Sequence, residues 1–456
     1  MMGVPVPDGK EGRVTFRVPM PRFSRRGLHP AAVLGSALAL AWLAGACAAP
    51  SAPAPGATPS PEAPASPERQ PAAPALDECA VTPAAPPGAD TIRVVAGSGF
   101  AAHQLYQTLV RLDCAGRLRP ALADDWASAD GGLSWTFSLG TARFWDGTPV
   151  TAEMIKAGWM QDSAATTRLR QAGVILISAR GDRELRILLA ARRQSVPEAL
   201  ADSRLAIARR VPESAWPIGT GPYHLPETDP APTTLEPVGG GRPVRVLSPP
   251  PDLRDAIDAG ADLVVTDDPA TLAYAAQRPD LTSVSLPWSR TYALALTAPA
   301  DSLMVTAAGF REALARDAVR VDARAAMRSQ FPPACAPRPA DPPRRAGRGA
   351  PRIGYPAGDG TARDLAARLA ALDVAGAHAI VPMAAAAFAA SRREGGEVAY
   401  VLSLPRGAGT CEDLPLPPGA AVVPLVDVRA HALVRRGAPP LTLDWDGAVR
   451  LLVEAP

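Results

Sequence analysis

The stretch from Leu105 to Trp159 constrains the fold more than any other, because short elements follow one another there in a fixed order. From Leu133 to Leu139 apolar and polar residues alternate, which is the period-two pattern of a half-buried strand. Turn signals lie on both sides of this strand, at Asp130–Gly132 and at Asp146–Pro149. Thr151 is then placed to cap a helix. The stretch therefore predicts a strand, a turn and a capped helix in succession.

Several residues of this stretch form a recurrent pattern. They are, in chain order, Tyr106, Leu109, Val110, Asp113, Pro120, Leu122, Ala123, Trp126, Trp135, Phe137, Leu139, Phe144, Asp146, Gly147, Thr148, Pro149, Thr151 and Ala152. A second short motif, Gly219–Tyr223, reads GTGPY. Both resemble the bacterial extracellular solute-binding proteins of family 5, which are the dipeptide, oligopeptide and nickel receptors of ABC importers. The resemblance implies an α/β, two-lobe, type II periplasmic-binding-protein-like fold with mixed sheets and a ligand cleft between the lobes.

Strands and helices continue to alternate after Tyr223, as in an α/β sheet with crossover helices. The roughly 380 residues that follow Cys79 are too many for one simple core, so we expect two lobes. Residues 79–300 are assigned to lobe I with a small inserted subdomain. Residues 301–411 are assigned to lobe II, and residues 412–456 to a return into lobe I.

The amino end has the features of an export signal. A basic region at Arg22–Arg26 precedes an apolar run, Ala31–Leu43, which is too short to span a bilayer comfortably. Small residues then lead to Cys47, in a pattern that resembles a lipobox. We expect residues 1–46 to be a signal peptide and Cys47 to carry a lipid. The alternative is an ordinary secretory signal without lipidation.

Residues 47–78 are predicted to be a disordered tether. They are rich in Ala, Pro, Ser and Glu, a composition that cannot bury enough apolar surface to offset chain entropy. A tether between a lipid and a folded domain predicts a protein that is exported and anchored to the cell envelope, on the periplasmic or outer face of the membrane.

The remaining four of the five cysteines are Cys79, Cys114, Cys335 and Cys411. An even number in an oxidising compartment favours disulfides. We expect the pairs Cys79–Cys114 and Cys335–Cys411, because each pair falls within one region of the expected fold. The alternative is four free thiols. None of the four is spaced as Cys-x-x-Cys or lies close to a histidine in sequence, so no metal site and no cofactor is expected.

Charge and motifs exclude other classes of protein. Residues 1–46 carry +4 of a net charge of +2, so the chain from Cys47 is near −2 and offers no basic face to nucleic acid. None of the five histidines adjoins a Gly-x-Ser-x-Gly elbow, and the chain has no His-Glu-x-x-His helix. We therefore expect a binding protein and not an enzyme.

Candidate ligand contacts are chosen by position and chemistry. A cleft that holds a polar solute needs aromatic walls and a few fixed polar groups. Trp288, Arg290 and Tyr292 lie on a connection that resembles the family's inter-lobe segment, and Phe100 and His103 follow the first strand. The alternative is that Trp288 and Tyr292 pack within lobe I and that Phe100 and His103 pack at a helix entry.

The resemblance implies a monomeric receptor that captures a small-molecule or peptide solute and delivers it to an ABC-transporter permease. Peptide-binding members commonly carry an aspartate that pairs with the peptide's amino group. No such aspartate follows the strand expected at Val398–Leu402. The alternative function is therefore a degenerate member that acts as an envelope sensor or interaction protein without transport.

Changing Cys47 to Ser tests the anchor. We expect the Cys47→Ser protein to leave the membrane fraction, because it lacks the thiol that accepts the lipid. The measurement is membrane partitioning together with the intact mass of the mature protein. Unchanged partitioning and unchanged mass would contradict lipidation at Cys47.

Overall fold

The structure is a computed structural model, which describes residues 68–69, 79–81, 90–97, 99–211, 216–226, 233–297, 307–327, 351–406, 416 and 420–452. The chain divides into two compact units, residues 1–64 and 65–456, and every described residue belongs to the second. The expected signal peptide, the lipidation site Cys47, nearly all of the tether and the pair Cys335–Cys411 lie outside the described residues.

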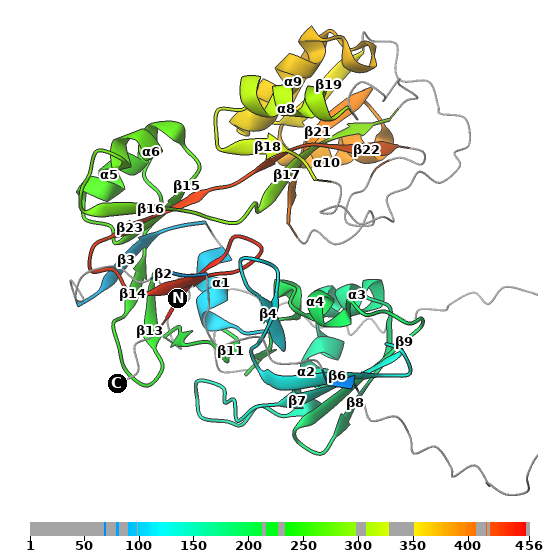
Figure 1. The fold of residues 1–456 in the computed structure, drawn as a ribbon, viewed down its shortest axis with the longest axis vertical. Coiled ribbons are helices and arrows are strands. Elements are labelled where there is room, and N and C mark those ends of the chain that lie inside the picture. The colour runs from blue at the N-terminus through cyan, green and yellow to red at the C-terminus, as the bar shows by residue number, and fades with distance from the viewer. Residues whose placement is uncertain are drawn as a thin grey trace, which may run out of the picture. The chain divides into compact units, whose positions relative to one another are not determined.

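A five-stranded antiparallel sheet holds the stretch that dominated the sequence (Figure 1). The strand expected at Leu133–Leu139 is confirmed as its third strand, and Thr151 caps the following helix by accepting from the Met154 N–H at 3.3 Å. The sheet order is β1 (Glu68–Arg69), β6 (Ala123–Ala129), β7 (Ser134–Leu139), β9 (Glu184–Leu189), β8 (Val174–Arg180), and its helices are α2 (Ala152–Gln161) and α3 (Ser163–Gln171).

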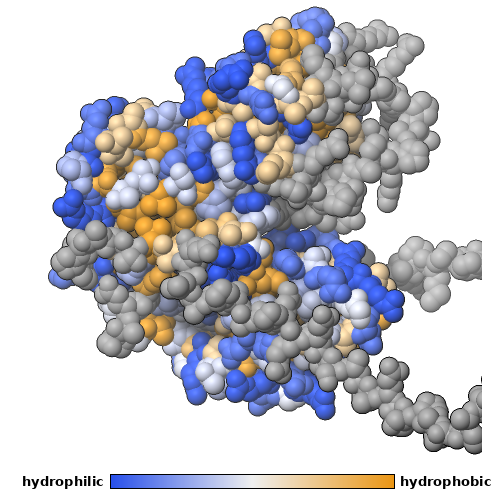
Figure 2. Space-filling model, in the orientation of Figure 1, coloured by the Kyte–Doolittle hydropathy of each residue, from blue (hydrophilic) through white to orange (hydrophobic). Residues whose placement is uncertain are grey.

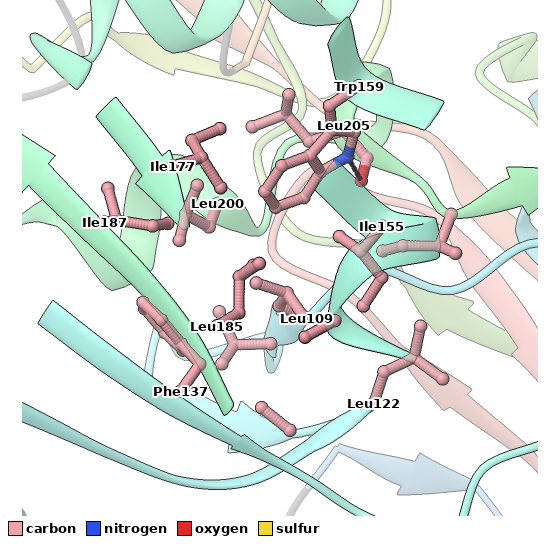
Figure 3. Close-up of a cluster of buried hydrophobic side chains, with 14 of the residues drawn as sticks. Leu109, Leu122, Phe137, Ile155, Trp159, Ile177, Leu185, Ile187, Leu200 and Leu205 are labelled. Atoms are coloured by element: carbon pink, nitrogen blue, oxygen red, sulfur yellow. Dashed lines mark hydrogen bonds between the residues drawn. The ribbon is translucent and has the colours of Figure 1, made fainter. Parts of the chain in front are cut away.

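The core of this sheet lies between its strands and its helices. Figure 3 shows Phe137, Leu185 and Ile187 directed from the strands toward Ile155 and Trp159 of α2. The Trp159 indole N–H donates to the Leu205 carbonyl at 3.0 Å, so the one polar atom of this buried ring has a partner. Each such side chain contributes about 1.5–3 kcal/mol by leaving water. The alternating apolar residues therefore account for this sheet.

A second sheet has seven strands and is mixed. Strand β3 is parallel to β14 and β15, and the other neighbouring strands are antiparallel. Helices α5 and α6 cover one of its faces, where Ile257 and Ala275 pack on Val264. The elements are β12 (Tyr223–His224), β13 (Thr234–Pro237), β14 (Val244–Val246), β3 (Ile92–Val95), β15 (Leu263–Thr266), β23 (His431–Arg435) and β16 (Leu281–Ser285), with α5 (Leu253–Asp258) and α6 (Pro269–Ala275).

A third sheet has six strands and is mixed, with helices on both faces. Leu294 of β17 packs toward Leu365 of α9, whereas its neighbour Ala293 packs toward Phe388 of α10. The elements, in sheet order, are β18 (Ala323–Ala325), β22 (Ala421–Val428), β17 (Arg290–Leu296), β21 (Ala399–Pro405), β19 (Arg352–Pro356) and β20 (Ala379–Met383), with α8 (Ala308–Asp317), α9 (Gly360–Ala371) and α10 (Ala385–Glu394).

The chain passes twice between the seven-stranded and the six-stranded sheet, from β16 to β17 and from β22 to β23 (Figure 1). Strand β17 pairs along its whole length with β21 and β22. Residues 290–296 and 421–428 therefore lie in the six-stranded sheet, whereas the division made from the sequence placed them in lobe I. Apolar alternation marks a strand but does not say which sheet it enters, which explains the difference.

Three smaller structural elements contribute to the wall of a cavity. They are the helix α1 (Gly99–Leu105), the hairpin of β4 (Val110–Leu112) and β5 (Leu118–Pro120), and the sheet of β2 (Ala80–Val81), β24 (Leu441–Leu443) and β25 (Val449–Leu451). The Gln104 side chain is fully buried and fastens α1 to β25, since it donates to the Val449 carbonyl at 2.8 Å and accepts from the Leu451 N–H at 3.0 Å.

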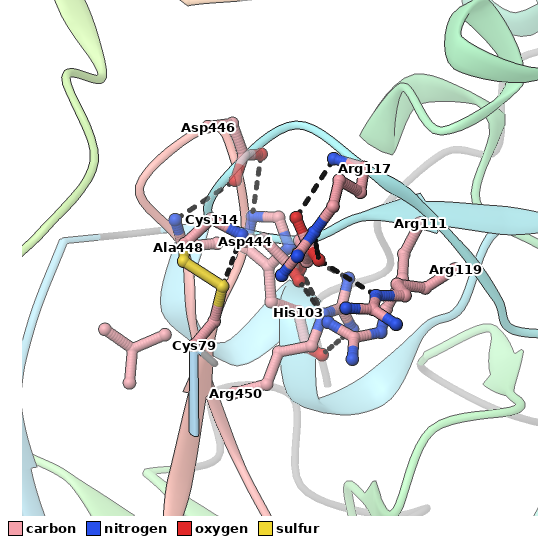
Figure 4. A network of polar contacts seen from close by, with 12 residues as sticks. Cys79, His103, Arg111, Cys114, Arg117, Arg119, Asp444, Asp446, Ala448 and Arg450 are labelled. Carbon is pink, nitrogen blue, oxygen red and sulfur yellow. Dashed lines mark hydrogen bonds and ion pairs between the residues drawn. A yellow bond between two sulfur atoms is a disulfide. The ribbon is translucent and has the colours of Figure 1, made fainter. Parts of the chain in front are cut away.

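A disulfide joins Cys79 to Cys114, the first pair expected from the sequence, with the two Cα atoms 5.6 Å apart. The Cys114 backbone N–H also donates to the Cys79 sulfur at 3.0 Å. The bond connects the strand β2 to the turn of the β4–β5 hairpin (Figure 4). No helix in the described ranges is long and apolar enough to cross a membrane.

Removing this disulfide should destabilise the fold. The bond closes a loop over a sequence separation of 35 residues, which corresponds to about 3–4 kcal/mol of chain entropy in the unfolded state. We expect the Cys79→Ser, Cys114→Ser double variant to lose this amount of unfolding free energy, measured by urea titration. A variant as stable as the wild type, or free thiols at both positions in non-reducing peptide mapping, would contradict the assignment.

Candidate functional site

The described part of the chain contains a cavity of about 1090 Å³. Its first wall consists of α1, the β4–β5 hairpin, the segment from α3 to residue 206 and the loop between β24 and β25. Its second wall consists of Pro356, α10 and the end of β21. In the space-filling view, hydrophilic residues gather over the α3 region that borders the cavity (Figure 2). The residues that line the cavity include both charged and apolar side chains.

The loop after β24 packs on the turn of the β4–β5 hairpin. The Trp445 N–H donates to the Leu112 carbonyl at 3.1 Å, and Asp444 and Asp113 form an isolated bridge. Gly116, with φ of +80°, lies against the indole, and a Cβ at this position would be 3.0 Å from the Trp445 Cδ1 atom. A glycine is thus required both by the backbone conformation and by the close approach of the ring.

Asp113 holds this hairpin from inside. Its side chain is fully buried, and it accepts from the Ala115 and Arg117 N–H groups at 3.0 Å and from the Nε atoms of Arg117 and Arg119 at 2.9 and 2.8 Å. Burial alone would raise the pKa of Asp113. The hydrogen bonds from Arg117 and Arg119 outweigh burial, so the pKa lies below its ordinary value.

A second carboxylate, that of Asp444, forms ion pairs with two arginines of the first wall (Figure 4). Asp444 accepts from Arg111 Nη1 at 3.1 Å and forms a short ion pair with Arg450 Nε. Arg450 also donates from Nη1 to the His103 carbonyl at 2.7 Å. Burial lowers the pKa of the His103 imidazole, and the positive charge of Arg450 lowers it further. The carboxylate of Asp446, 3.9 Å away, raises the pKa but does not compensate for burial.

Asp202 forms ion pairs with two further arginines of the first wall. It lies 2.8 Å from Arg168 Nε and 2.8 Å from Arg204 Nη2. Burial would raise the pKa of Asp202, but the hydrogen bonds from Arg204 and the charge of Arg168 lower it. The arginines of the first wall thus have carboxylate partners within the protein.

The second wall differs, because Arg406 and Arg392 form no ion pair with any described residue. The Arg406 guanidinium lies 3.8 Å above the Trp445 ring and donates from Nη1 to the Trp445 carbonyl at 3.1 Å. Burial lowers the pKa of Arg406 to about 10. Arg392 lies 5.0 Å from the Phe388 ring centroid, and burial lowers its pKa as well.

The candidates chosen from the sequence have different environments. His103 lines the cavity, whereas Phe100, Trp288, Arg290 and Tyr292 do not. Phe100 lies in the core of the seven-stranded sheet, and Arg290 is exposed at the start of β17. Tyr292 is 2% exposed and donates its hydroxyl to Asp359, the N-cap of α9, at 3.0 Å.

Trp288 lies between two guanidinium groups, 4.4 Å from that of Arg324 and 4.5 Å from that of Arg429. It is therefore enclosed beside the crossing from β16 to β17. The sequence did not indicate Trp445, Arg406 or Arg392 as cavity residues. Residues 412–456 were assigned to the return into lobe I, but the tryptophan of their LDWDG segment, Leu443–Gly447, carried no mark of a ligand contact.

Comparisons with known proteins agree with this fold. Residues 117–237 match the family model described as the middle part of bacterial extracellular solute-binding proteins, family 5. No curated protein matches the sequence. Among solved structures, the Escherichia coli murein tripeptide binding protein MppA aligns with a TM-score of 0.58 and 12% identity, over 80% of this chain and 99% of that chain.

Two further structures align in the same way. NikA from Brucella suis, in complex with Fe(III)-EDTA, has a TM-score of 0.54 and 17% identity over 76% of this chain and 95% of its own. AgaA from A. tumefacien R10, in complex with agropinic acid, has a TM-score of 0.56 and 13% identity over 80% of this chain and 99% of its own. The chain thus has the fold of type II periplasmic binding proteins. The resemblance to family 5 solute-binding proteins is confirmed, with the sequence match over residues 117–237.

Changing Asp113 to Asn tests the anchor of the first wall. We expect the loss of about 3–5 kcal/mol of unfolding free energy at pH 7, because the ion pairs of Arg117 and Arg119 with this fully buried carboxylate are lost. The folded pKa lies below the ordinary value of 3.8, so the stabilisation by Asp113 is present above pH 3.8 and is lost as pH falls through the folded pKa. The measurement is chemical unfolding of both proteins from pH 7 downward.

The matched control is Asp317→Asn, which removes an exposed carboxylate beside Arg316 and should change stability by less than about 0.5 kcal/mol. An Asp113→Asn protein as stable as this control, or a difference from wild type that does not shrink in acid, would contradict the assigned role.

Proposed function

We propose that this protein is a solute-binding receptor that captures a small solute and delivers it to the permease of an ABC importer. The observation that carries the proposal is the cavity of about 1090 Å³, which two walls of the chain enclose in a fold shared with binding proteins. Ligand sites of small molecules commonly have volumes of about 300–1,000 Å³ and combine apolar walls with a few fixed polar groups. MppA is a binding protein, and the structures of NikA and AgaA each contain a bound small molecule.

The composition of the walls supports binding without covalent chemistry. Tyr106, Phe388 and Trp445 supply aromatic surface, and Leu402 and Leu404 supply aliphatic surface. The charged side chains of the first wall are tied to one another by ion pairs, which holds them in place before a ligand arrives. Such a wall is preorganised and costs little side-chain entropy on binding.

Domain closure fits the way the chain crosses between sheets. The two crossings, β16 to β17 and β22 to β23, are the natural position for a hinge, because few residues there would absorb the change in backbone angles. We place the lobe boundary at these crossings. The second wall then moves with the six-stranded sheet and the first wall with the remainder of the unit.

The amino end completes the proposal. A signal peptide at residues 1–46, a lipid on Cys47 and a tether at residues 47–78 would hold a monomeric receptor at the outer face of a membrane. The family is named for extracellular binding proteins, which fits export. Delivery to a permease requires this location, since the importer takes up solute from that side.

The function can be tested without knowledge of the ligand. The tagged protein is purified from its natural host, and native mass spectrometry shows whether a small molecule is bound. A thermal-shift screen against peptides, sugars, metal chelates and opines then identifies the class. We expect bound solute, a stabilising ligand that raises the unfolding temperature, and loss of uptake of that ligand in a host that lacks this chain.

Two results would contradict the proposal. A protein that carries no solute and responds to no ligand in the screen would not be a receptor. A protein that binds a solute whose uptake is unchanged in the deleted host would be a sensor or an interaction protein and would not serve an importer.

A further inference from the structure

The charges that line the cavity do not balance. Six arginines and four carboxyl groups contribute to its walls. Asp444 is paired with Arg111 and Arg450, and Asp202 is paired with Arg168 and Arg204. The other two carboxyl groups, Glu198 and Asp446, both belong to the first wall. Partial burial raises the pKa of Glu198.

The two remaining arginines are Arg406 and Arg392, both on the second wall. Contacts of both the main chain and the side chain hold Arg406. Its backbone N–H donates to the Ser289 carbonyl at 2.6 Å, its Nη1 donates to the Trp445 carbonyl at 3.1 Å, and its Cζ atom lies 3.8 Å from the centroid of the Trp445 ring. The guanidinium is therefore positioned before any ligand binds.

Arg406 lines the cavity and forms no ion pair with a described residue. Its Nη1 donates to the Trp445 carbonyl, and its Nε is buried without a hydrogen bond to a described residue. A guanidinium in such a wall can bind a carboxylate through the N–H groups that Trp445 does not use.

Arg392 repeats the situation on the helix α10. Its Nε is also buried without a partner in the described part of the chain, and its guanidinium lies over the Phe388 ring at 5.0 Å. Phe388 lies one turn earlier on the same helix, and both residues line the cavity. Two arginines of one wall thus each present a positive charge beside an aromatic ring and without a carboxylate.

A partly buried guanidinium without a carboxylate partner is unfavourable, and a bound anion offsets part of this cost. We propose that the solute is a small organic anion whose carboxylate is bound by Arg406 and Arg392, with its apolar part against Trp445 and Phe388. The inference rests on the proposed function, because it names the class of solute that the receptor takes. It also assigns the recognition of charge to the second wall, because the arginines of the first wall already have Asp444 and Asp202 as ion-pair partners.

The test compares three variants with the wild type, namely Arg406→Gln, Arg392→Gln and the control Arg393→Gln. Arg393 adjoins Arg392 on α10, is exposed and does not line the cavity. The control removes the same charge from the same helix, so it reports any general loss of positive potential. Circular dichroism and thermal unfolding establish that each variant is folded.

The measurement is the mass and charge class of the small molecule released from protein purified from the natural host, followed by titration calorimetry of that molecule and of its carboxamide. We expect a carboxylate-bearing molecule. Arg406→Gln and Arg392→Gln should each weaken its binding by about 10- to 100-fold, as for the loss of a charge-assisted hydrogen bond. Arg393→Gln should bind like the wild type, and the carboxamide should bind wild type as weakly as the acid binds the variants.

Arg406 also contacts Trp445, so Arg406→Gln could disturb the wall itself. Arg392→Gln removes no hydrogen bond to a described residue and serves as the independent variant. Release of a neutral or cationic solute would overturn the inference, and so would equal affinity of the acid for wild type, Arg392→Gln and Arg393→Gln. Either result leaves the receptor function standing. The absence of any bound solute would instead contradict the receptor function.

Discussion

The carboxylate of Asp113 is fully buried, and two backbone N–H groups and two arginines donate to it. These bonds close the turn of the β4–β5 hairpin, to which the Cys79–Cys114 disulfide adds a covalent tie. The loop that carries Trp445 rests on this turn. Because Trp445 in turn stacks on Arg406, the geometry of both cavity walls depends on how firmly this hairpin is held. We therefore expect the contacts that close this hairpin to affect ligand binding as well as the stability of the fold.

The two walls treat their arginines differently. The first wall pairs its arginines with Asp444 and Asp202, and these ion pairs hold the side chains in place. The second wall leaves Arg406 and Arg392 without a carboxylate among the described residues, and places each beside an aromatic ring. Aromatic faces position a guanidinium without competing for the hydrogen bonds of its edge. This division separates the scaffold of the cavity from the groups that would recognise a ligand.

Short-range patterns in the sequence predicted much of the fold. The alternation at Leu133–Leu139 became β7, and Thr151 became the cap of α2. These succeeded because a strand's period and a helix cap depend on neighbouring residues alone. The division of lobes at residue 300 did not anticipate that β17 joins the six-stranded sheet, because that choice depends on pairing with β21 and β22, which lie more than a hundred residues away. The candidates Trp288 and Tyr292 were chosen for aromatic character, a property shared by cavity walls and by packed cores.

The sequence by itself determined the class of the protein. The motif residues between Tyr106 and Ala152, the GTGPY segment and an even set of cysteines after Cys47 are all local signals, and they indicated a binding-protein fold and the Cys79–Cys114 bond. Only the tertiary structure decided which side chains line the cavity. Trp445 and Arg406 are 39 positions apart, and Arg111 and Asp444 are 333 apart. Contacts at such separations arise from the packing of whole sheets and hairpins, so no periodicity in the chain could bring these residues together in advance.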